Sequence, residues 1–511
     1  MRVRVRVRVR GWVGRLVGVR GVVAVRRLVG VRVREPLVRE SPGAVSLVVV
    51  GAGPAGVAAA VCAADRGVRV VLVDSAVRAG GQFYRQPDAR WGARRPQVLH
   101  HAWRTWQRLT ARLDAHLADG LITHLAERHV WFVERADGGG FVVHALGGSG
   151  QDRPQTVRGD AVLLATGAYE KVLPFPGWTL PGVVTAGGAQ AMLKGGLVLP
   201  PGRTAVVAGT GPLLMPVAAG LSAAGARVAA LIESAGPGRL AWGAVRLAGH
   251  PAKLAEGARY AAALARRGVP VRTGHAVVAA HGSERLEAVT VAALDGAGRV
   301  RAGTGRRIAC DALAVGHGLL PHTDLAGGLG CRIAETGHGG WGVAVDGEQR
   351  TDVPGVWAAG EASGVGGAEL ALAEGEIAGR SIAARLRGRE PDRRGCAAAA
   401  GARARLRAFA RVIDAVYVPP AHWAERVGDD TVVCRCEEVT ASAVRSAVVE
   451  LGATDLRGVK LLTRAGMGWC QGRVCAPGVA GVAGCAWSPG SRALAQPVPL
   501  AVLAGDEGAV P

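Results

Sequence analysis

The stretch SLVVVGAGPAGVAAAVCAADRGVRVVLVDS, residues 46–75, joins an apolar run, a glycine-rich turn, an alanine-rich segment and a second apolar run that ends in an acid. This order predicts a strand, a helix and a parallel strand, and an ordinary glycine-rich turn is the weaker alternative. Such glycines allow a tight turn, close approach of a pyrophosphate and close packing of the helix on its strand. The helix N-terminus would stabilise the phosphate charge, and the acid would bind a ribose. The dinucleotide-binding residues predicted here are Gly51, Gly53, Pro54, Ala55, Gly56 and Asp74.

Length and charge set broad limits. The 511 residues suffice for about three domains with substantial cores. The net charge of +22 rests on 58 Arg against 4 Lys, a skew typical of coding bias, so no nucleic-acid partner is predicted. Much of the excess lies in residues 1–40, which hold 12 Arg and 2 Glu. Their Arg-Val alternation could form a cationic strand on an anionic membrane surface, but low-complexity disorder or an early start codon is favoured.

The composition also limits the cellular compartment. Arginines interrupt every apolar run near the N-terminus, so no signal peptide is predicted. Prolines and glycine pairs break the two uncharged stretches at 172–193 and 204–226, so neither is predicted to cross a membrane. Nine unevenly spaced cysteines favour a reducing compartment, and we expect a cytoplasmic protein without a disulfide framework.

Three further segments indicate which dinucleotide binds. RAGGQFYRQP (78–87) is a second glycine loop, GDAVLLATGAYEKVLPFPGWTLPGV (159–183) contains a strand, and TDVPGVWAAGEASGVGGAELALAEGEIAG (351–379) joins a strand to a glycine-rich helix start. In this order they resemble the FAD domain of flavoproteins with two dinucleotide-binding domains. The family's usual Asp in the third segment is a glutamate in this sequence. By this resemblance the further FAD contacts are Gly81, Gln82, Thr166, Gly167, Gly360 and Glu361.

Between these segments a second nucleotide-binding pattern appears at 203–234, RTAVVAGTGPLLMPVAAGLSAAGARVAALIES. Gly209 and Gly211 occupy the first two glycine positions, but Leu214 occupies the third. A leucine there prevents the closest packing of helix on strand, so an NAD(P) site and a domain kept only for its shape both stay open. If a nucleotide binds, Glu233 favours a free ribose hydroxyl over a 2′-phosphate.

Four cysteines lie close together near the C-terminus, in VVCRCEEVT (432–440) and AGMGWCQGRVC (465–475). Zinc sites more often use cysteine pairs two residues apart, whereas iron-sulfur clusters require thiolate ligands throughout. The segments resemble the bacterioferritin-associated ferredoxin type of [2Fe-2S] domain, and zinc or four separate thiols are the alternatives. The ligands implied are Cys434, Cys436, Cys470 and Cys475.

No catalytic residue is predicted. His100, His101, His124 and His129 have no converging carboxylate or cysteine motif, so they are expected on the surface or in helices. The other five cysteines have no paired spacing and are expected to act as small buried apolar residues.

Taken together, residues 45–475 resemble the FAD-containing large (alpha or A) subunits of heteromeric bacterial dehydrogenases. That group includes opine oxidases, D-hydroxyproline and proline dehydrogenases and the B chain type of hydrogen cyanide synthase, and sarcosine oxidase alpha subunits are a more distant resemblance. In that family a smaller D-amino-acid-oxidase-like flavoprotein subunit oxidises the amine or imino acid, and some members hold FMN at a subunit interface. The resemblance implies an FAD- and [2Fe-2S]-dependent oxidoreductase that moves electrons onward to an acceptor the sequence does not identify.

Two other functions stay open. An NAD(P)H-dependent reductase of the pyridine-nucleotide-disulfide type would pass electrons through the cluster to a protein acceptor, and Leu214 counts against it. A non-enzymatic, iron-responsive binding partner is disfavoured because the FAD patterns are intact. The genomic neighbourhood of an oxidase-like subunit gene would separate these functions.

The predicted fold class is α/β: an FAD domain with an inserted NAD-like Rossmann domain, then a small α-helical [2Fe-2S] domain. The amphipathic stretch AFARVIDAVYVPP (408–420) is expected to dock on the FAD domain. The predicted boundaries are a low-complexity tail at 1–44, FAD domain at 45–180 and 307–385, inserted domain at 181–306, helical linker at 386–430, cluster domain at 431–490 and C-terminal tail at 491–511.

Overall fold

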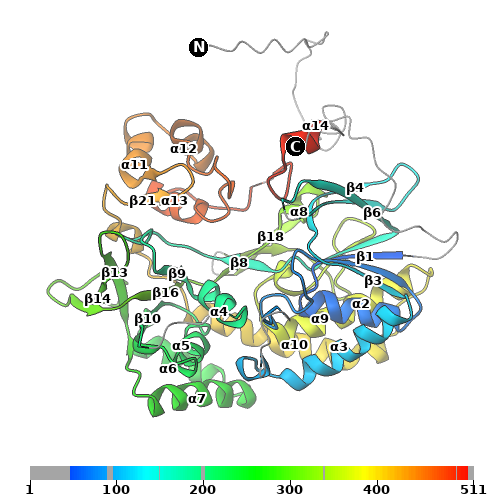
Figure 1. Cartoon of the computed structure of the whole chain (residues 1–511), viewed down its shortest axis with the longest axis horizontal. Coiled ribbons are helices and arrows are strands. Elements are labelled where there is room, and N and C mark those ends of the chain that lie inside the picture. Colours follow the sequence, from blue (N-terminus) through cyan, green and yellow to red (C-terminus); the bar gives the residue numbers. More distant parts are fainter. Residues whose placement is uncertain are drawn as a thin grey trace, which may run out of the picture.

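The computed structural model describes residues 46–88, 96–148, 150–196, 202–337, 340–490 and 492–504 (Figure 1). The Arg-Val tail, and with it the prediction of disorder, lies outside the described residues. Within these ranges no helix is long and apolar enough to cross a membrane.

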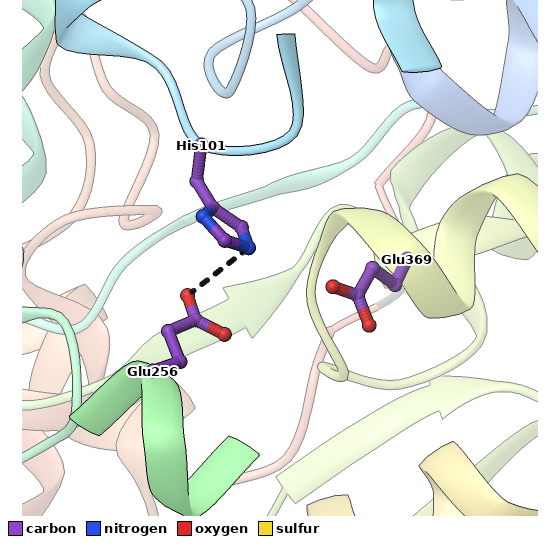
Figure 2. Close-up of side chains that lie close together, drawn as sticks. All are labelled: His101, Glu256 and Glu369. Atoms are coloured by element: carbon purple, nitrogen blue, oxygen red, sulfur yellow. Dashed lines mark ion pairs between the residues drawn. The ribbon is translucent and has the colours of Figure 1, made fainter. Parts of the chain in front are cut away.

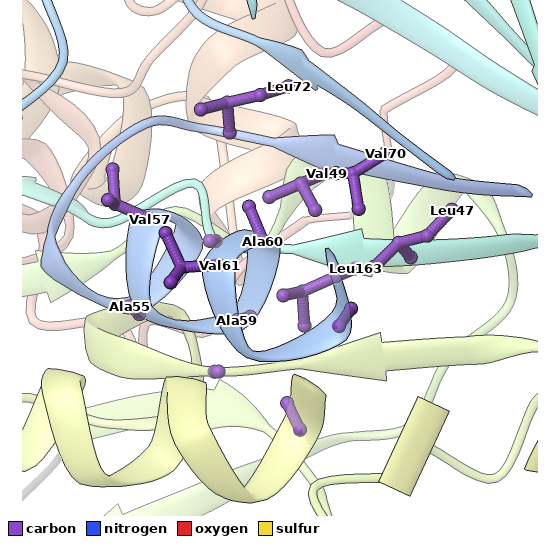
Figure 3. Packing of buried hydrophobic residues seen from close by; sticks show 14 of the residues in the cluster. Leu47, Val49, Ala55, Val57, Ala59, Ala60, Val61, Val70, Leu72 and Leu163 are labelled. Carbon is purple, nitrogen blue, oxygen red and sulfur yellow. The ribbon is translucent and has the colours of Figure 1, made fainter. Parts of the chain in front are cut away.

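The first domain is built on a five-stranded parallel sheet of order β20-β7-β1-β2-β3. Helix α2 (Pro54–Ala64) joins β1 to β2, and proline at its first position suits a helix start, where no N–H is needed. The sheet strands are β1 (Ser46–Val50), β2 (Arg69–Val73), β3 (Ile122–Leu125), β7 (Ala161–Leu164) and β20 (Val356–Ala358). Figure 3 shows apolar side chains of β1, β2 and β7 packed onto α2, which forms the buried core of this domain.

Two glycines let a second helix pack on α2. On α9 (Ala368–Arg385), a Cβ at Gly375 would lie 2.2 Å from the carbonyl oxygen of Ala55. One at Gly379 would lie 2.6 Å from that of Ala59. Only glycine permits this backbone-to-backbone approach, so the residues near the end of the sequence pattern hold the helix near its beginning.

The rest of the first domain surrounds this sheet. A three-stranded antiparallel sheet of order β4-β5-β6 covers one side, and two two-stranded sheets pair β8 with β17 and β18 with β19. The elements are η2 (Pro96–Leu99), α3 (Trp103–Ala118), β4 (His129–Arg135), β5 (Phe141–Gly147), β6 (Arg153–Gly159), β8 (Ala168–Glu170), β17 (Leu319–Pro321), α8 (Asp324–Gly328), β18 (Ile333–Gly337), β19 (Gly340–Val343) and η3 (Gly360–Ser363).

The middle domain repeats the parallel architecture with the order β12-β11-β10-β16-β9 and adds an antiparallel sheet of order β13-β14-β15. Its strands are β9 (Val183–Thr185), β10 (Thr204–Gly209), β11 (Arg227–Glu233), β12 (Val271–Thr273), β13 (His275–His281), β14 (Ala288–Ala293), β15 (Arg306–Ala309) and β16 (Ala312–Gly316). Its helices are α4 (Ala186–Lys194), α5 (Leu214–Ala223), α6 (Pro237–Arg246) and α7 (Pro251–Arg266).

The predicted return to the first domain at residue 307 is too early. Strand β15 pairs with β14, and β16 pairs in parallel with both β10 and β9, so both strands belong to the middle domain. Asp311 holds the connection between them, because its Oδ2 accepts a hydrogen bond of 2.8 Å from the N–H of Thr204. The chain re-enters the first domain after Gly316, through β17.

A long helix and a small domain follow. Helix α10 (Arg393–Val416) runs along α9, and its C-terminal half contacts the middle domain. The Phe409 ring lies 5.6 Å from that of His250, and Val416 packs on Gly243 of α6. The stretch 408–420 therefore docks on the middle domain and not, as predicted, on the first, because its apolar side chains follow the face turned toward α6.

The cysteine domain, residues 432–483, is mostly helical and lies beside β9 and β13 in Figure 1. The Trp178 Nε1–H donates a 2.6 Å hydrogen bond to the carbonyl of Val432, which joins this domain to the segment that enters the middle domain. Its elements, with the preceding and following turns, are η4 (Trp423–Arg426), β21 (Val432–Cys434), β22 (Val439–Thr440), α11 (Ala441–Val449), α12 (Leu456–Thr463), α13 (Ala476–Ala483) and α14 (Leu500–Ala504).

Candidate functional site

The first glycine turn lies at the carboxyl end of β1, where a parallel sheet usually receives a ligand. A Cβ at Gly51 would lie 2.3 Å from the carbonyl oxygen of Ala165, and one at Gly56 would lie 1.8 Å from that of Gly51. Both glycines are therefore required by the fold itself. At Gly53 the nearest atom to a Cβ would be the Cα of Gly81, 4.0 Å away, so this position faces open space at the start of α2.

Two loops complete one side of this turn. Asp74 follows β2, and its Oδ2 accepts a 2.5 Å hydrogen bond from the N–H of Ala52 while the carboxylate stays half-buried. Gly81 has φ +57° and lies against Gly53, and the side chain of Gln82 is exposed beside it. The geometry leaves a carboxylate, an amide and backbone N–H groups at one edge, as a ribose and pyrophosphate require.

The last predicted residues meet the turn from the other side. Gly360, at φ +74°, is so close to α2 that a Cβ would lie 2.9 Å from the Cβ of Ala55. Glu361 accepts a 3.2 Å hydrogen bond from the N–H of Gly367, and burial raises the pKa of its carboxyl. Thr166 and Gly167 follow β7, and no atom lies within 4 Å of a Cβ at Gly167. The structure thus brings together all the predicted residues, while their contact with FAD stays a prediction.

Sequence reasoning missed the carboxylate that holds this side of the site. Glu374 of α9 is fully buried and accepts hydrogen bonds from the N–H of Gly360, at 3.0 Å, and from Ser363 Oγ, at 3.1 Å. Its charge is balanced by Arg407 of α10, whose Nε lies 2.9 Å from Glu374 Oε1. A buried carboxylate needs such a partner. Nothing in the local pattern of α9 identifies an arginine 33 residues later.

The middle-domain turn differs from the first in how far it is covered. Leu214 is buried under Ala186 and Gly316, as its place in the glycine pattern predicts. The carboxylate of Glu233 accepts hydrogen bonds from Thr210 Oγ1, at 2.7 Å, and from the N–H of Gly211, at 3.1 Å. Glu233 is only 6% exposed, whereas Asp74 at the equivalent position of the first domain is half-buried.

A segment after α10 covers this second site. Glu233 contributes to the raised pKa of Tyr417, which follows α10, although burial is the main cause. Farther along, Ala421 lies against Gly298, and Trp423 and Arg426 line a cavity with Gly209. Residues 417–426 therefore lie along the edge at which a dinucleotide would bind.

Burial of Glu233 has a consequence for stability. It raises the pKa of this carboxyl to about 7 despite three hydrogen bonds from backbone N–H groups and one from Thr210. Because the folded pKa lies above the unfolded value, its contribution is fully present below about pH 4.5 and is lost as the pH rises through about 7. We expect Glu233→Gln to reduce the loss of stability between pH 5.5 and 8.5 by about 2 kcal/mol. Chemical denaturation of both proteins across that range measures the difference, and parallel curves would contradict it.

The cysteine site gathers from two loops. Cys434 and Cys475 are buried, Cys470 is half-buried and Cys436 is exposed. The N–H of Gly466 points at the Cys434 sulfur from 3.4 Å, and a Cβ at Gly468 would lie 2.3 Å from that of Cys436. The glycines therefore allow backbone to pack directly against the sulfurs.

The arrangement of the four sulfurs separates the two kinds of metal site. Hydrogen bonding with Cys475 lowers the pKa of Cys434 and of Cys470, and Cys436 is hydrogen-bonded to Cys470. Among the described residues, however, no three of these Sγ atoms all lie within 4.8 Å of one another. A single zinc ion with bonds of about 2.3 Å would bring all four within about 4 Å. The all-thiolate donor set and its wider spread fit a two-iron cluster better than zinc.

A buried salt bridge fixes the second cysteine loop to the first domain. Arg473 lies between Cys470 and Cys475, and its Nε is 2.8 Å from Asp324 Oδ2, while Arg492 Nη1 is 2.5 Å from Oδ1. Burial would raise the pKa of Asp324, but nearby His322 and the two arginines outweigh it and hold the pKa well below its usual range. The carboxylate is therefore charged when it holds the loop.

The same salt bridge adjoins the flavin-type site. The backbone carbonyl of His322 accepts a 2.7 Å hydrogen bond from Thr166 Oγ1, and the N–H of His322 donates to the carbonyl of Gly167 at 2.9 Å. Tyr169 of β8 is buried near Asp324, and the Cys470 thiol is among the charges that raise the pKa of its phenol, after burial. The cysteine loop and the Thr166–Gly167 turn are thus connected through a few buried residues.

One histidine predicted to have no partners does meet carboxylates. His101 Nε2 lies 3.9 Å from Glu256 Oε1, and Glu369 stands opposite, as Figure 2 shows. Lys253 lies between the two acids, with Nζ 3.0 Å from Glu256 and 3.1 Å from Glu369. The group joins the first and middle domains, and the lysine already supplies its cation. Sequence could not reveal it because its members come from separate elements.

Comparisons with known proteins agree with this geometry. The family model described as pyridine nucleotide-disulphide oxidoreductase matches residues 45–376, and the BFD-like [2Fe-2S] binding domain matches residues 432–482. The HcnB subunit of hydrogen cyanide synthase from Pseudomonas aeruginosa is 36% identical over 441 residues, which cover 84% of this chain and 90% of that protein. The opine oxidase A-type subunit of Rhizobium meliloti is 35% identical over 437 residues, covering 84% and 90%.

Among solved structures, L-proline dehydrogenase from P. horikoshii matches with a TM-score of 0.62 and 20% identity, over 90% of this chain and 79% of that chain. At this identity the match supports the fold alone. It is consistent with the predicted α/β class.

Proposed function

Because the chain belongs to the pyridine nucleotide-disulphide oxidoreductase family and is a flavoprotein oxidoreductase with a [2Fe-2S] domain, we propose that it is the electron-transferring large subunit of a heteromeric amine or imino-acid dehydrogenase. Two relatives are named as subunits of an opine oxidase and of a hydrogen cyanide synthase. The substrate class we propose is an opine, a hydroxyproline or a similar secondary amine.

The observation that carries this proposal is the salt bridge between Arg473 and Asp324. It holds the loop with two cluster ligands against the turn of Thr166 and Gly167, where the flavin is predicted to lie. Bound FAD accepts a pair of electrons and a [2Fe-2S] cluster carries one at a time, so the pair can divide two electrons into single steps. Tyr169 and His322 fill the space between the two sites and exclude water from it.

The residues present fit both groups. Gly53, Gly81 and Gly167 leave the first turn open at the carboxyl edge of the sheet, and Asp74 would bind the ribose. The four cysteines would ligate the irons, and the N–H of Gly466 would donate to one of their sulfurs. An FMN at the interface with the smaller subunit is part of this proposal, as some relatives of this type hold one.

Exposed apolar side chains support a protein partner. Five large apolar residues of the cysteine domain are well exposed: Val449 (83%), Leu451 (61%), Leu461 (65%), Leu462 (49%) and Trp469 (79%). Trp469 directly precedes the ligand Cys470. Such residues are costly to leave in water and favour a surface covered by another protein.

The decisive experiment is co-expression with a D-amino-acid-oxidase-like subunit from the same genome. We expect the two chains to co-purify and to reduce an artificial acceptor with an opine or hydroxyproline, whereas neither chain alone does so. A large subunit that neither binds such a partner nor accepts electrons from it would refute the proposal.

The covered middle domain separates this function from the reductase alternative. With Leu214 at the third glycine position, and residues 417–426 over the site of Glu233 and Gly209, we expect anaerobic NADH or NADPH to bleach the flavin slowly or not at all. Dithionite serves as the positive control for flavin reduction. Rapid bleaching by either nucleotide would favour the reductase.

The salt bridge itself can be tested. Asp324→Asn keeps the shape of the side chain but leaves Arg473 and Arg492 without a buried counter-charge, at a cost of about 3–5 kcal/mol. We expect electron transfer between flavin and cluster to slow about tenfold or more, with both cofactors retained. Stopped-flow absorbance of the reduced protein measures the rate. Glu390→Gln, which breaks an exposed ion pair with Arg385, is the control and should change little.

A further inference from the structure

A cavity away from the predicted flavin and cluster sites gathers basic side chains. It lies at the carboxyl ends of β10 and β16 and is lined by Gly209, Phe175, Trp423, His317 and Arg426, with other apolar residues. His317 directly follows β16, and Arg426 ends η4. Residues of the middle domain and of the linker before the cysteine domain thus share one enclosed space.

Two nitrogen atoms in this cavity have no partner. Among the described residues, neither Nδ1 of His317 nor Nη1 of Arg426 is hydrogen-bonded, although both atoms are buried. A buried N–H without an acceptor costs about 1–3 kcal/mol, and more on a charged group. Both atoms therefore have hydrogen-bonding capacity that a ligand could satisfy.

A third cation is close by, and no acid balances the three. Lys171 follows β8, and its charge, with that of Arg426, adds to burial in lowering the pKa of His317 to about 3. Burial also lowers the pKa of Lys171 and of Arg426, and no carboxylate is among the causes for any of the three groups. The neighbourhood carries two positive charges and a neutral imidazole, without a counter-ion.

We propose that Lys171, His317 and Arg426 form an oxyanion site that binds the phosphate group of a small molecule or inorganic phosphate. The space open to the centres of water-sized molecules is about 20 Å³, which admits one small group and not a nucleotide. A phosphate dianion matches the two cations, whereas a carboxylate leaves one charge unbalanced. Arginine binds phosphate oxygens through its planar fork, and a neutral imidazole Nδ1–H would add one donor.

The test uses the full-length protein purified without phosphate. Calorimetric titration with inorganic phosphate, glycerol phosphate and acetate is expected to show binding of one phosphate compound per chain and at least about tenfold weaker acetate binding. Tight binding of inorganic phosphate alone identifies free phosphate as the ligand, and tighter binding of glycerol phosphate identifies an ester. Equal affinity for acetate, or no binding of either phosphate compound, overturns the proposal.

Variants assign the binding to this cavity. Arg426→Gln and Lys171→Met should each weaken phosphate binding about tenfold or more, with flavin and iron contents unchanged. Arg267→Gln alters an exposed arginine of the same domain and should bind phosphate as the unaltered protein does. Lys171→Met keeps the test valid if loss of the half-buried Arg426 prevents folding. Wild-type affinity in Lys171→Met, or in a folded Arg426→Gln, overturns the assignment.

Discussion

A Gly53→Val protein is expected to fold and to be purified without FAD. Gly53 has ordinary backbone angles, φ −72° and ψ −177°, so a side chain there causes no strain. A Cβ would meet only the Cα of Gly81 at 4.0 Å, and the added methyl groups would project into the open edge where we place the pyrophosphate. We expect FAD affinity to fall by about 100-fold or more, because phosphate can then no longer approach the N-terminus of α2.

The neighbouring glycines cannot give so clear a result. A side chain at Gly51 or Gly56 would collide with backbone carbonyls and damage the fold whether or not a cofactor binds. Gly257→Val on α7, where no atom lies within 4 Å of a Cβ, is the matched control and should retain FAD. Circular dichroism checks the fold, and absorbance checks the flavin content. A full flavin spectrum in Gly53→Val would show that FAD does not lie on this turn.

Local patterns predicted most of what depends on local chemistry. The βαβ unit around Gly51 and Asp74 follows from a strand, a turn and a helix that are adjacent in sequence, and the structure has all three. Leu214 could be judged in the same way, because the third glycine of such a turn contacts its own strand. In these cases the residues that decide the geometry lie within one short segment.

Long-range pairing is where prediction from sequence failed. The run before His317 is a good strand, but its pattern does not say which sheet it joins, and the structure pairs it with β10 and β9. Likewise, Asp324 opens a short helix and Arg473 lies in a cysteine loop 149 residues later. Their salt bridge depends on how separate domains pack, which no local periodicity encodes. The residues that connect the two predicted cofactor sites were therefore found only in the structure.

A Cys470→Ser protein is expected to lose the iron-sulfur cluster and retain the flavin. Serine is a poor ligand for iron compared with a thiolate, and Cys470 is close to both Cys436 and Cys475, so its loss affects ligands from both loops. The first glycine turn lies in a different domain and should be unaffected. We expect iron and acid-labile sulfide to fall from about two each per chain to near zero, with FAD content unchanged.

The cysteine domain contains its own control. Cys485 follows α13, lies ten residues beyond Cys475 and is only half-buried, so Cys485→Ser should keep the cluster and its rhombic electron paramagnetic resonance signal. One zinc per chain without labile sulfide in the unaltered protein would instead make this domain a structural zinc site.

Turnover then tests whether electrons pass through the cysteine domain. With the smaller subunit present, Cys470→Ser should still allow one reduction of the partner's flavin by the amine, because that step takes place on the partner. Steady-state reduction of an external acceptor should fall about tenfold or more, since single electrons can no longer leave past Arg473 and Tyr169. If the cluster is lost but turnover is unchanged, the electrons leave directly from the flavin edge near Thr166, and the salt bridge at Asp324 serves only to hold the domains together.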